Sequence, residues 1–290
     1  MTRTARIGIT LMLGDDGISP TELARAVEER GFESLWLPEH SHIPISRDTP
    51  WPGSLSGEPL PEVYSHLLDM TVSLAMAAAV TTRLRLGTSV ALLAARDVLW
   101  TAKEYATLDR LSGGRVEFGV GFGWNREELA NHGVGFERRW DHTREAAVAL
   151  RSVWNDDVAS FHGEHVAFTP SWAWPKPARS DGPKVHVGGG AGPRVLRNVA
   201  EWADGWMPIS ARSSLADRLA RLDEACDRAG RDRREIDVSV FGATTDPDGL
   251  ASLFEEGVHR AVLTLPSHHR DDVLRRLDEL APLVDVNAGG

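Results

Sequence analysis

The chain has 290 residues, 42% of them hydrophobic, and a formal net charge of −10. This length suits one large α/β domain, since a barrel of alternating strands and helices takes about 250 residues. The acidic balance argues against a nucleic-acid partner, and no apolar run approaches the ~20 residues that span a bilayer. The opening MTRTARIGIT lacks a signal-peptide pattern, so we expect a cytoplasmic protein without a membrane partner.

Strands and helices alternate from the start of the chain. Residues 6–13 and 34–37 are the first two predicted strands, and the helix between them begins at the capping box Ser19-Pro20-Thr21-Glu22. Residues 41–61 are rich in Pro, Gly and Ser. A loop this long in a compact domain is usually a lid or a binding loop. A helix is predicted over residues 64–80.

The middle of the chain continues the alternation. A predicted strand over residues 84–93 is followed by a helix that Asp97 can cap and that Ser112-Gly113-Gly114 ends. The strand at residues 116–120 runs into the glycine-rich loop GVGFGW. Two helical segments then lead to a proline-rich excursion with a hairpin over residues 155–183.

Four further strands, each separated by a helix, are predicted at residues 184–188, 205–209, 236–241 and 258–265. Eight strands alternating with helices predict a single (β/α)8 TIM barrel over residues 1–290, with insertions after strands 2 and 4. A flat doubly wound sheet is the alternative. The glycine motif comes late in the chain rather than after the first strand, which disfavours a dinucleotide-binding sheet.

The chemistry of such a barrel lies at the C-terminal ends of its strands. Glu39 and His40 directly follow the second predicted strand. Histidine titrates near neutral pH, so His40 can move a proton or donate to a substrate oxygen. Ser89-Val90 ends the third strand, and the loop at residues 121–124 ends the fourth. Within that loop Gly121 and Gly123 would let the backbone approach a bound ring.

A second glycine-rich run, Gly188-Gly189-Gly190-Ala191-Gly192-Pro193-Arg194, follows the fifth strand and opens a helix. Free amides at a helix N-terminus attract anions, and glycine allows a phosphate to come close. Arg194 would add positive charge. The alternative is a flexible turn before a helix that begins at proline.

The sequences of three runs, LGTSV, AKEYATLDRLSGGR and GVGFGW, closely resemble those of the luciferase-like monooxygenase superfamily. Within it, the resemblance is best to the branch that uses the deazaflavin coenzyme F420. The resemblance implies a bacterial-luciferase-type barrel that moves a hydride between F420 and a small organic substrate. FMN is the alternative cofactor, in a monooxygenase or reductase. The resemblance also implies homodimers, in which the apolar helix at residues 67–80 would pack against a partner or, alternatively, against the barrel.

The same resemblance assigns roles to single residues. It implies a non-proline cis peptide at Ser89-Val90 that supports the tricyclic ring, and a cofactor phosphate held by the glycine run at Gly188, Gly189 and Gly190. It places His40 as the acid/base or polarising group, with Glu39 orienting it or contacting the cofactor.

Two further sets of residues bear on the ligands. The F420 tail carries carboxylates, for which Arg138, Arg139 and Arg194 are candidates. Four tryptophans in predicted loops would wall an apolar substrate pocket or, alternatively, pack beneath the long loops: Trp51, Trp124, Trp172 and Trp174.

Two other classes of function stay open. His40-Ser41-His42, with His186 as a third ligand, would suit a metal-dependent hydrolase. Against this, the pair follows strand two, and no aspartate ends the last strand, so we expect no metal. A barrel that binds the ring without turnover is the third possibility.

Overall fold

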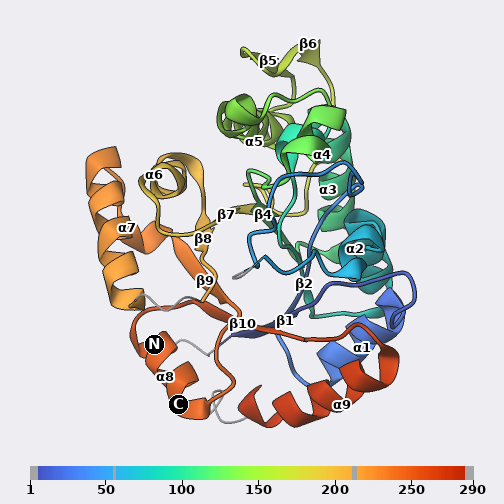
Figure 1. The fold of residues 1–290 in the computed structure, drawn as a ribbon. Coiled ribbons are helices and arrows are strands. Elements are labelled where there is room, and N and C mark those ends of the chain that lie inside the picture. Colours follow the sequence, from blue (N-terminus) through green and yellow to red (C-terminus); the bar gives the residue numbers. More distant parts are fainter. Residues whose placement is uncertain (1–5, 55–56, 211–213, 285–290) are drawn as a thin grey trace.

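The computed structural model describes residues 6–54, 57–210 and 214–284. Eight parallel strands of these residues close into a barrel in the order β1-β10-β9-β8-β7-β4-β3-β2. Helices surround the barrel in Figure 1, and β5 and β6 form a separate hairpin outside it. The predicted (β/α)8 barrel is confirmed, and the closed order excludes the flat doubly wound sheet.

The bounds of the elements are as follows. The barrel strands are β1 Ile7–Thr10, β2 Ser34–Leu37, β3 Arg85–Thr88, β4 Val116–Val120, β7 Lys184–Gly188, β8 Gly205–Met207, β9 Asp237–Phe241 and β10 Arg260–Thr264. The hairpin is β5 Ala159–His162 and β6 Ala167–Ser171. The helices are α1 Pro20–Glu29, α2 Met70–Val80, α3 Val98–Ser112, α4 Arg126–Asn131, α5 Arg139–Asn155, α6 Pro193–Trp202, α7 Leu215–Ala229, α8 Pro247–Glu255 and α9 Arg270–Leu280.

The helix boundaries follow from local chemistry. The Asp97 side chain accepts a hydrogen bond from the Trp100 N–H at 2.8 Å, which begins α3. Gly113 ends α3 with φ +73°, a left-handed conformation that glycine adopts without strain. The helix predicted over residues 64–80 is shorter, because Asp69 caps it at 2.7 Å from the Val72 N–H and only a 3-10 turn, Glu62–Ser65, precedes it.

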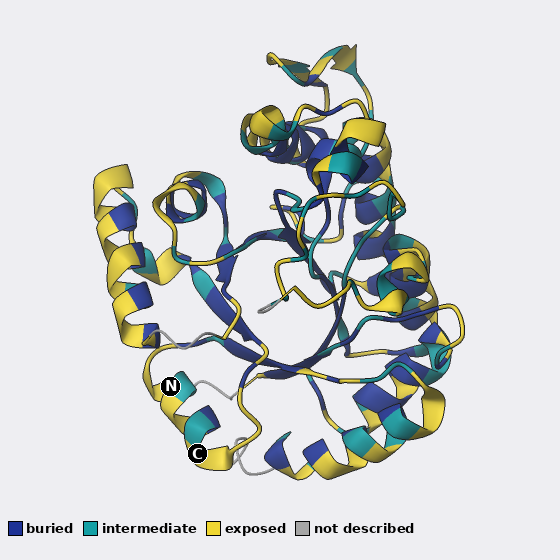
Figure 2. Cartoon of the chain, viewed as in Figure 1, coloured by how far each residue is buried: buried dark blue, intermediate teal, exposed yellow. Residues whose placement is uncertain are grey.

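Burial follows the barrel geometry. Figure 2 shows the strands and the inward faces of the helices buried, and the outer faces of the helices exposed. Within the described residues, no helix combines the length and apolar character that a bilayer span requires. The barrel strands are mostly buried on both faces, as expected of a parallel sheet that helices cover.

Trp36 fills the axis of the barrel. Its indole is fully buried and donates from Nε1 to the Ser34 hydroxyl at 2.8 Å. A Cβ at Gly87, on the neighbouring strand, would overlap the Trp36 ring. Trp36 packs with three residues of the later strands, Met207, Phe241 and Val262. The side chain therefore separates the two ends of the barrel interior.

Charged residues at the strand starts fill the other end. Arg260, fully buried, binds both carboxylate oxygens of Glu33 at 2.8 Å and stacks 5.2 Å from the Trp36 ring. Glu117 accepts from His186 Nε2 at 2.6 Å and from Arg85. Burial alone would raise the pKa of Glu117, but the hydrogen bond with His186 and the charge of Arg260 hold that pKa well below its usual range.

Removing the central cation should therefore destabilise the fold. In Arg260→Met, Glu33 and Glu117 lose their buried counter-charge, and we expect the free energy of unfolding to fall by about 3–5 kcal/mol in urea titrations. Arg234→Ala is the control, because its ion pair with Asp232 lies on the surface and its loss should change stability little. Equal stability of the two variants would contradict this account.

Candidate active site at the C-terminal end of the barrel

The Ser89–Val90 peptide bond, just after β3, is cis, as the family resemblance implies. Its ends are tied to both neighbouring strands: the Ser89 N–H donates to the Leu37 carbonyl at 2.7 Å, and the Ala91 N–H donates to the Gly119 carbonyl at 2.8 Å. The Val90 side chain packs against the Trp36 cluster and thus faces the barrel mouth.

Two glycines make room for Val90. A Cβ at Gly121 would overlap Val90 Cγ2, and one at Gly188 would lie 2.8 Å from Val90 Cγ1. The structure thus brings the candidate residues of three strands, Ser89-Val90, Gly121 and Gly188, to one spot at the barrel mouth. Gly123 has another role, because its φ of +72° suits glycine and it packs against Leu129.

The glycine run after β7 is an open cradle. Gly189 has φ +145°, and its carbonyl accepts from Trp206 Nε1 at 2.9 Å. A Cβ at Gly190 or Gly192 would meet no atom within 4 Å. Gly192 is the N-cap of α6 and offers no side chain to cap the first N–H groups of the helix. These amides fit an anionic group such as a cofactor phosphate.

Cationic side chains stand beside this cradle. Arg194 lies 4.8 Å from the Trp140 ring and Arg139 lies 5.3 Å from it, while Arg126 stacks at 4.4 Å on Phe136. Partial burial and the repulsion from Arg194 and Arg126 lower the pKa of Arg139, although Glu137 opposes this. Like charges held this close favour an anion between them. Arg138 instead points to Glu164 at 3.8 Å and is largely exposed.

His40 is bound to a carboxylate that the sequence analysis missed. His40 Nδ1 lies 2.7 Å from Glu128 Oε2, and the side chains are only 7% and 1% exposed. The other oxygen of Glu128 accepts from the Ser41 N–H at 3.0 Å. Glu128 comes from α4, 88 residues along the chain, and Asn125 caps that helix through the Glu128 N–H at 3.3 Å.

Glu39, the neighbour of His40, has different partners. Its carboxylate accepts from the Leu92 N–H at 2.7 Å and pairs with Arg96, which also binds Glu104 at 2.7 Å. Burial raises the pKa of Glu39, and the Arg96 charge and the Leu92 N–H oppose that rise. Glu39 therefore ties the ends of β2 and β3 together, and the carboxylate that contacts the His40 imidazole is Glu128.

An aromatic wall stands over His40. The His40 ring lies 5.5 Å from the Tyr64 ring and 5.6 Å from the Trp124 ring. Trp51 donates from Nε1 to the Tyr64 hydroxyl at 2.9 Å. Trp51 and Trp124 thus meet at the candidate site, through Tyr64, which the sequence analysis did not single out.

Trp172 and Trp174 lie elsewhere, so the prediction that they wall the same pocket is wrong. They follow the β5–β6 hairpin and are 82% and 57% exposed. The Trp174 carbonyl accepts from Lys103 of α3, on the outer side of the barrel.

A cavity of about 220 Å³ borders the His40–Glu128 pair. Its walls come from the segments after β2 and β3 and from the starts of α2 and α4: Glu39, His40, Ser41, Leu68, Asp69, Met70, Leu92, Ala95, Arg96, Glu128 and His132. Neither Val90 nor the glycine run lines it. The cavity is therefore separate from the spot where Val90 meets the glycines.

Helix α4 also holds the middle of the loop between β2 and α2. The Glu127 carboxylate, on α4, accepts from the Asp48 N–H at 3.0 Å, the Thr49 N–H at 3.2 Å and the Thr49 hydroxyl at 2.6 Å. The Thr49 hydroxyl above all lowers the pKa of Glu127 to about 2. Arg47 of the same loop lies 5.5 Å from the Trp124 ring, so the loop covers the aromatic wall.

The histidines of the hydrolase alternative do not come together. His186 is buried in the barrel on Glu117, whereas His42 bonds to Asn131 at 2.8 Å outside it. Among the described residues, the group of three or more side chains placed to hold a metal ion contains neither of them.

Comparison with known proteins identifies the family. A profile described as luciferase-like monooxygenase matches residues 18–248. An uncharacterised protein of Mycobacterium tuberculosis is 39% identical over 274 residues, which cover 94% of this chain and 96% of that protein. A phthiodiolone/phenolphthiodiolone dimycocerosates ketoreductase of M. tuberculosis is 29% identical over 241 residues, covering 80% of this chain and 63% of that protein.

Solved structures share the fold at low identity. A monooxygenase, RslO1, of Streptomyces bottropensis superposes with a TM-score of 0.77 at 18% identity, covering 96% of this chain and 98% of that one. An F420-dependent tetrahydromethanopterin reductase of Methanopyrus kandleri gives 0.68 at 18% identity, covering 96% and 99%. The FMN-bound oxygenating constituent of 3,6-diketocamphane monooxygenase of Pseudomonas putida gives 0.69 at 15% identity, covering 99% and 97%.

The profile spans most of the chain, and the 39%-identical relative is matched over nearly its whole length. The closed barrel has the architecture of the solved structures. This chain belongs to the luciferase-like monooxygenase family of oxidoreductases, whose members use F420 or FMN.

Proposed function

We propose that this protein is an F420-dependent oxidoreductase that moves a hydride between the deazaflavin and a small, largely apolar organic substrate. The observation that carries the proposal is the His40–Glu128 pair at 2.7 Å, buried beneath an aromatic wall at the C-terminal end of the barrel. Reduction of a carbonyl or imine needs a proton alongside each hydride, and a positioned histidine is the usual donor.

The mouth of the barrel fits the proposed cofactor. Val90, seated between Gly121 and Gly188, would support one face of the ring, and the Gly190–Gly192 amides with the α6 N-terminus would hold the phosphate. When bound, the cofactor supplies the hydride. The protein's own residues orient the substrate and exclude water, while His40 holds the matching proton and Glu128 fixes its ring.

The choice of F420 over FMN rests on the arginines beside the cradle. FMN ends at its phosphate, whereas F420 continues into a tail of carboxylates. Arg194 and Arg139 share the Trp140 ring next to the glycine run, where such a tail would leave the barrel. Arg194 forms only a long ion pair of 3.8 Å with the largely exposed Asp141, and the exposed Glu137 pairs with Arg126 at 3.6 Å.

Cofactor binding tests this assignment directly. We expect the purified protein to retain F420 and quench or shift its fluorescence, with much weaker binding of FMN. Arg194→Ala should weaken F420 binding by roughly tenfold, the scale of one lost charge-assisted hydrogen bond, and weaken FMN binding less, because FMN offers the arginine only its phosphate. Arg138→Ala is the matched control. Retention of FMN alone would overturn the deazaflavin assignment.

His40 should be needed for turnover but not for cofactor binding. His40→Ala should lower kcat by about 10²-fold or more while F420 binding stays intact. Glu128→Gln should lower kcat with little change in KM, because it weakens the hydrogen bond that orients the His40 imidazole but leaves the aromatic wall intact. The control is His42→Ala, whose ring faces Asn131. Wild-type turnover in His40→Ala would favour another proton donor.

We further propose that a second copy of the chain covers the outer face of α2 and α3. Helix α2 buries Met70 and Leu74 against the barrel yet leaves Val72 and Met76 60% and 41% exposed. Trp100, on the adjacent helix α3, is 69% exposed. Exposed large apolar side chains gathered on two neighbouring helices indicate a protein interface.

Sedimentation measures this association. We expect the wild-type protein to sediment as a dimer, and Trp100→Glu to sediment as a monomer because a charge at the centre of the face would have to be desolvated. Val148→Glu on α5 is the control for an added charge at another exposed apolar position. A wild-type monomer at micromolar concentration would rule out this interface.

A further inference from the structure

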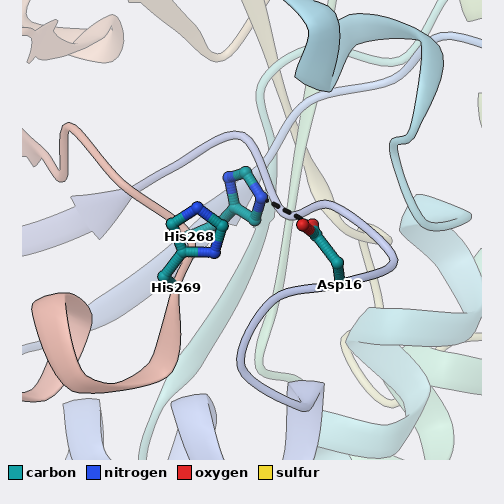
Figure 3. Close-up of side chains that lie close together, drawn as sticks. All are labelled: Asp16, His268 and His269. Atoms are coloured by element: carbon teal, nitrogen blue, oxygen red, sulfur yellow. Dashed lines mark hydrogen bonds and ion pairs between the residues drawn. The ribbon is translucent and has the colours of Figure 1, made fainter.

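The segments that follow the first and last barrel strands meet above the β1–β10 pair. Leu265, just after β10, donates its N–H to the Thr10 carbonyl of β1 at 2.9 Å. The Ile18 N–H donates to the His268 carbonyl at 2.8 Å. Figure 3 shows the result: Asp16 reaches across from the β1 loop to the adjacent imidazoles of His268 and His269.

The packing holds the His268 side chain in place. A Cβ at Gly17 would lie 2.7 Å from the His268 carbonyl and 2.9 Å from its Cδ2, and one at Gly14 would lie 3.1 Å from its Nε2. The His268 ring therefore rests against the loop that carries Asp16. Asp16 Oδ1 lies 2.8 Å from His268 Nε2, and His268 is only 17% exposed.

His269 adds a third donor atom to the same spot. Its ring centroid lies 4.5 Å from that of His268 at an interplanar angle of 42°. One donor atom from each of the three residues lies within 4.8 Å of the others. Ligand atoms around a tetrahedral Zn²⁺ lie about 3.4 Å apart, given metal–ligand bonds of about 2.0–2.2 Å. Small rotations of exposed side chains close that difference.

The environment of His269 argues for a ligand rather than a structural contact. Its backbone N–H is fixed by the Ser267 hydroxyl at 3.1 Å, whereas its ring makes no hydrogen bond within the described residues. The Asp16–His268 hydrogen bond alone would suffice for a contact between the loops, but it does not account for the position of the His269 imidazole. Two imidazoles and one carboxylate are a donor set that zinc and related divalent ions prefer.

We propose that Asp16, His268 and His269 form a binding site for a divalent transition-metal ion of the zinc type, with water in its remaining position. The site lies at the rim of the barrel, on segments other than those that carry His40 and Glu128. An ion there would join the loops that follow the first and last strands, so its binding should stabilise the closed barrel.

Zinc titration of the full chain, stripped of metal and carrying no polyhistidine tag, tests the site. At pH 7.5, where free histidine is mostly neutral, calorimetry should show one equivalent of Zn²⁺ bound with a micromolar or lower Kd. Saturating Zn²⁺ should raise the Tm by a few degrees. Asp16→Asn and His269→Ala should each weaken binding at least tenfold and abolish the Tm rise. His162→Ala, which removes an exposed histidine from the hairpin, should bind as the wild type does.

His269→Ala is the decisive variant, because it removes a ligand without breaking a hydrogen bond of its ring, and its Tm without metal should match that of the wild type. Zinc binding by His269→Ala with unchanged affinity would overturn the proposal. So would the absence of saturable binding to the wild type at millimolar Zn²⁺. In either case the trio would be only a hydrogen-bonded contact between loops.

Discussion

The buried indole of Trp36 is the constraint on which the interior of this barrel depends. It occupies the axis because Gly87 leaves the space that a Cβ would take. On the side of the strand starts, Arg260 stacks on the ring and gathers Glu33 and Glu117 around it. A full guanidinium can be buried there only because carboxylates compensate its charge. The strand ends are thereby left free of structural charges on the axis.

Because the buried charges lie at the strand starts, the C-terminal end of the barrel is left for ligands. The groups on the axis there are small or apolar, with Val90 held between Gly121 and Gly188. The polar side chains lie around the margin in pairs, Glu39 with Arg96 and His40 with Glu128. A planar cofactor ring bound there would meet no unpaired charge over its faces. Under the proposed function, His40 would donate a proton near its edge.

Alternation of strands and helices, together with caps such as Asp97 and stops such as Gly113, predicted the barrel and most element positions, because these signals are local. The cis bond after β3 came from the family resemblance and not from residue chemistry. Glu128 was missed because its sequence context, REELAN, is typical of a short surface helix. Its contact with His40, 88 residues earlier in the sequence, forms only when the chain folds. The error at Trp172 has the same origin. The local sequence around a loop tryptophan is similar whether the side chain lines a pocket or lies outside it, and only tertiary packing determines its position.

One short helix, α4, carries two consecutive carboxylates with different partners. Glu127 holds the backbone at Asp48 and Thr49, and Glu128 holds the imidazole of His40. The same helix thus holds both the loop over the site and the proposed proton donor, His40. Under the proposed function, a substrate that displaces the loop from Glu127 would also disturb the helix that positions His40, which would couple enclosure of the site to alignment of the proton donor.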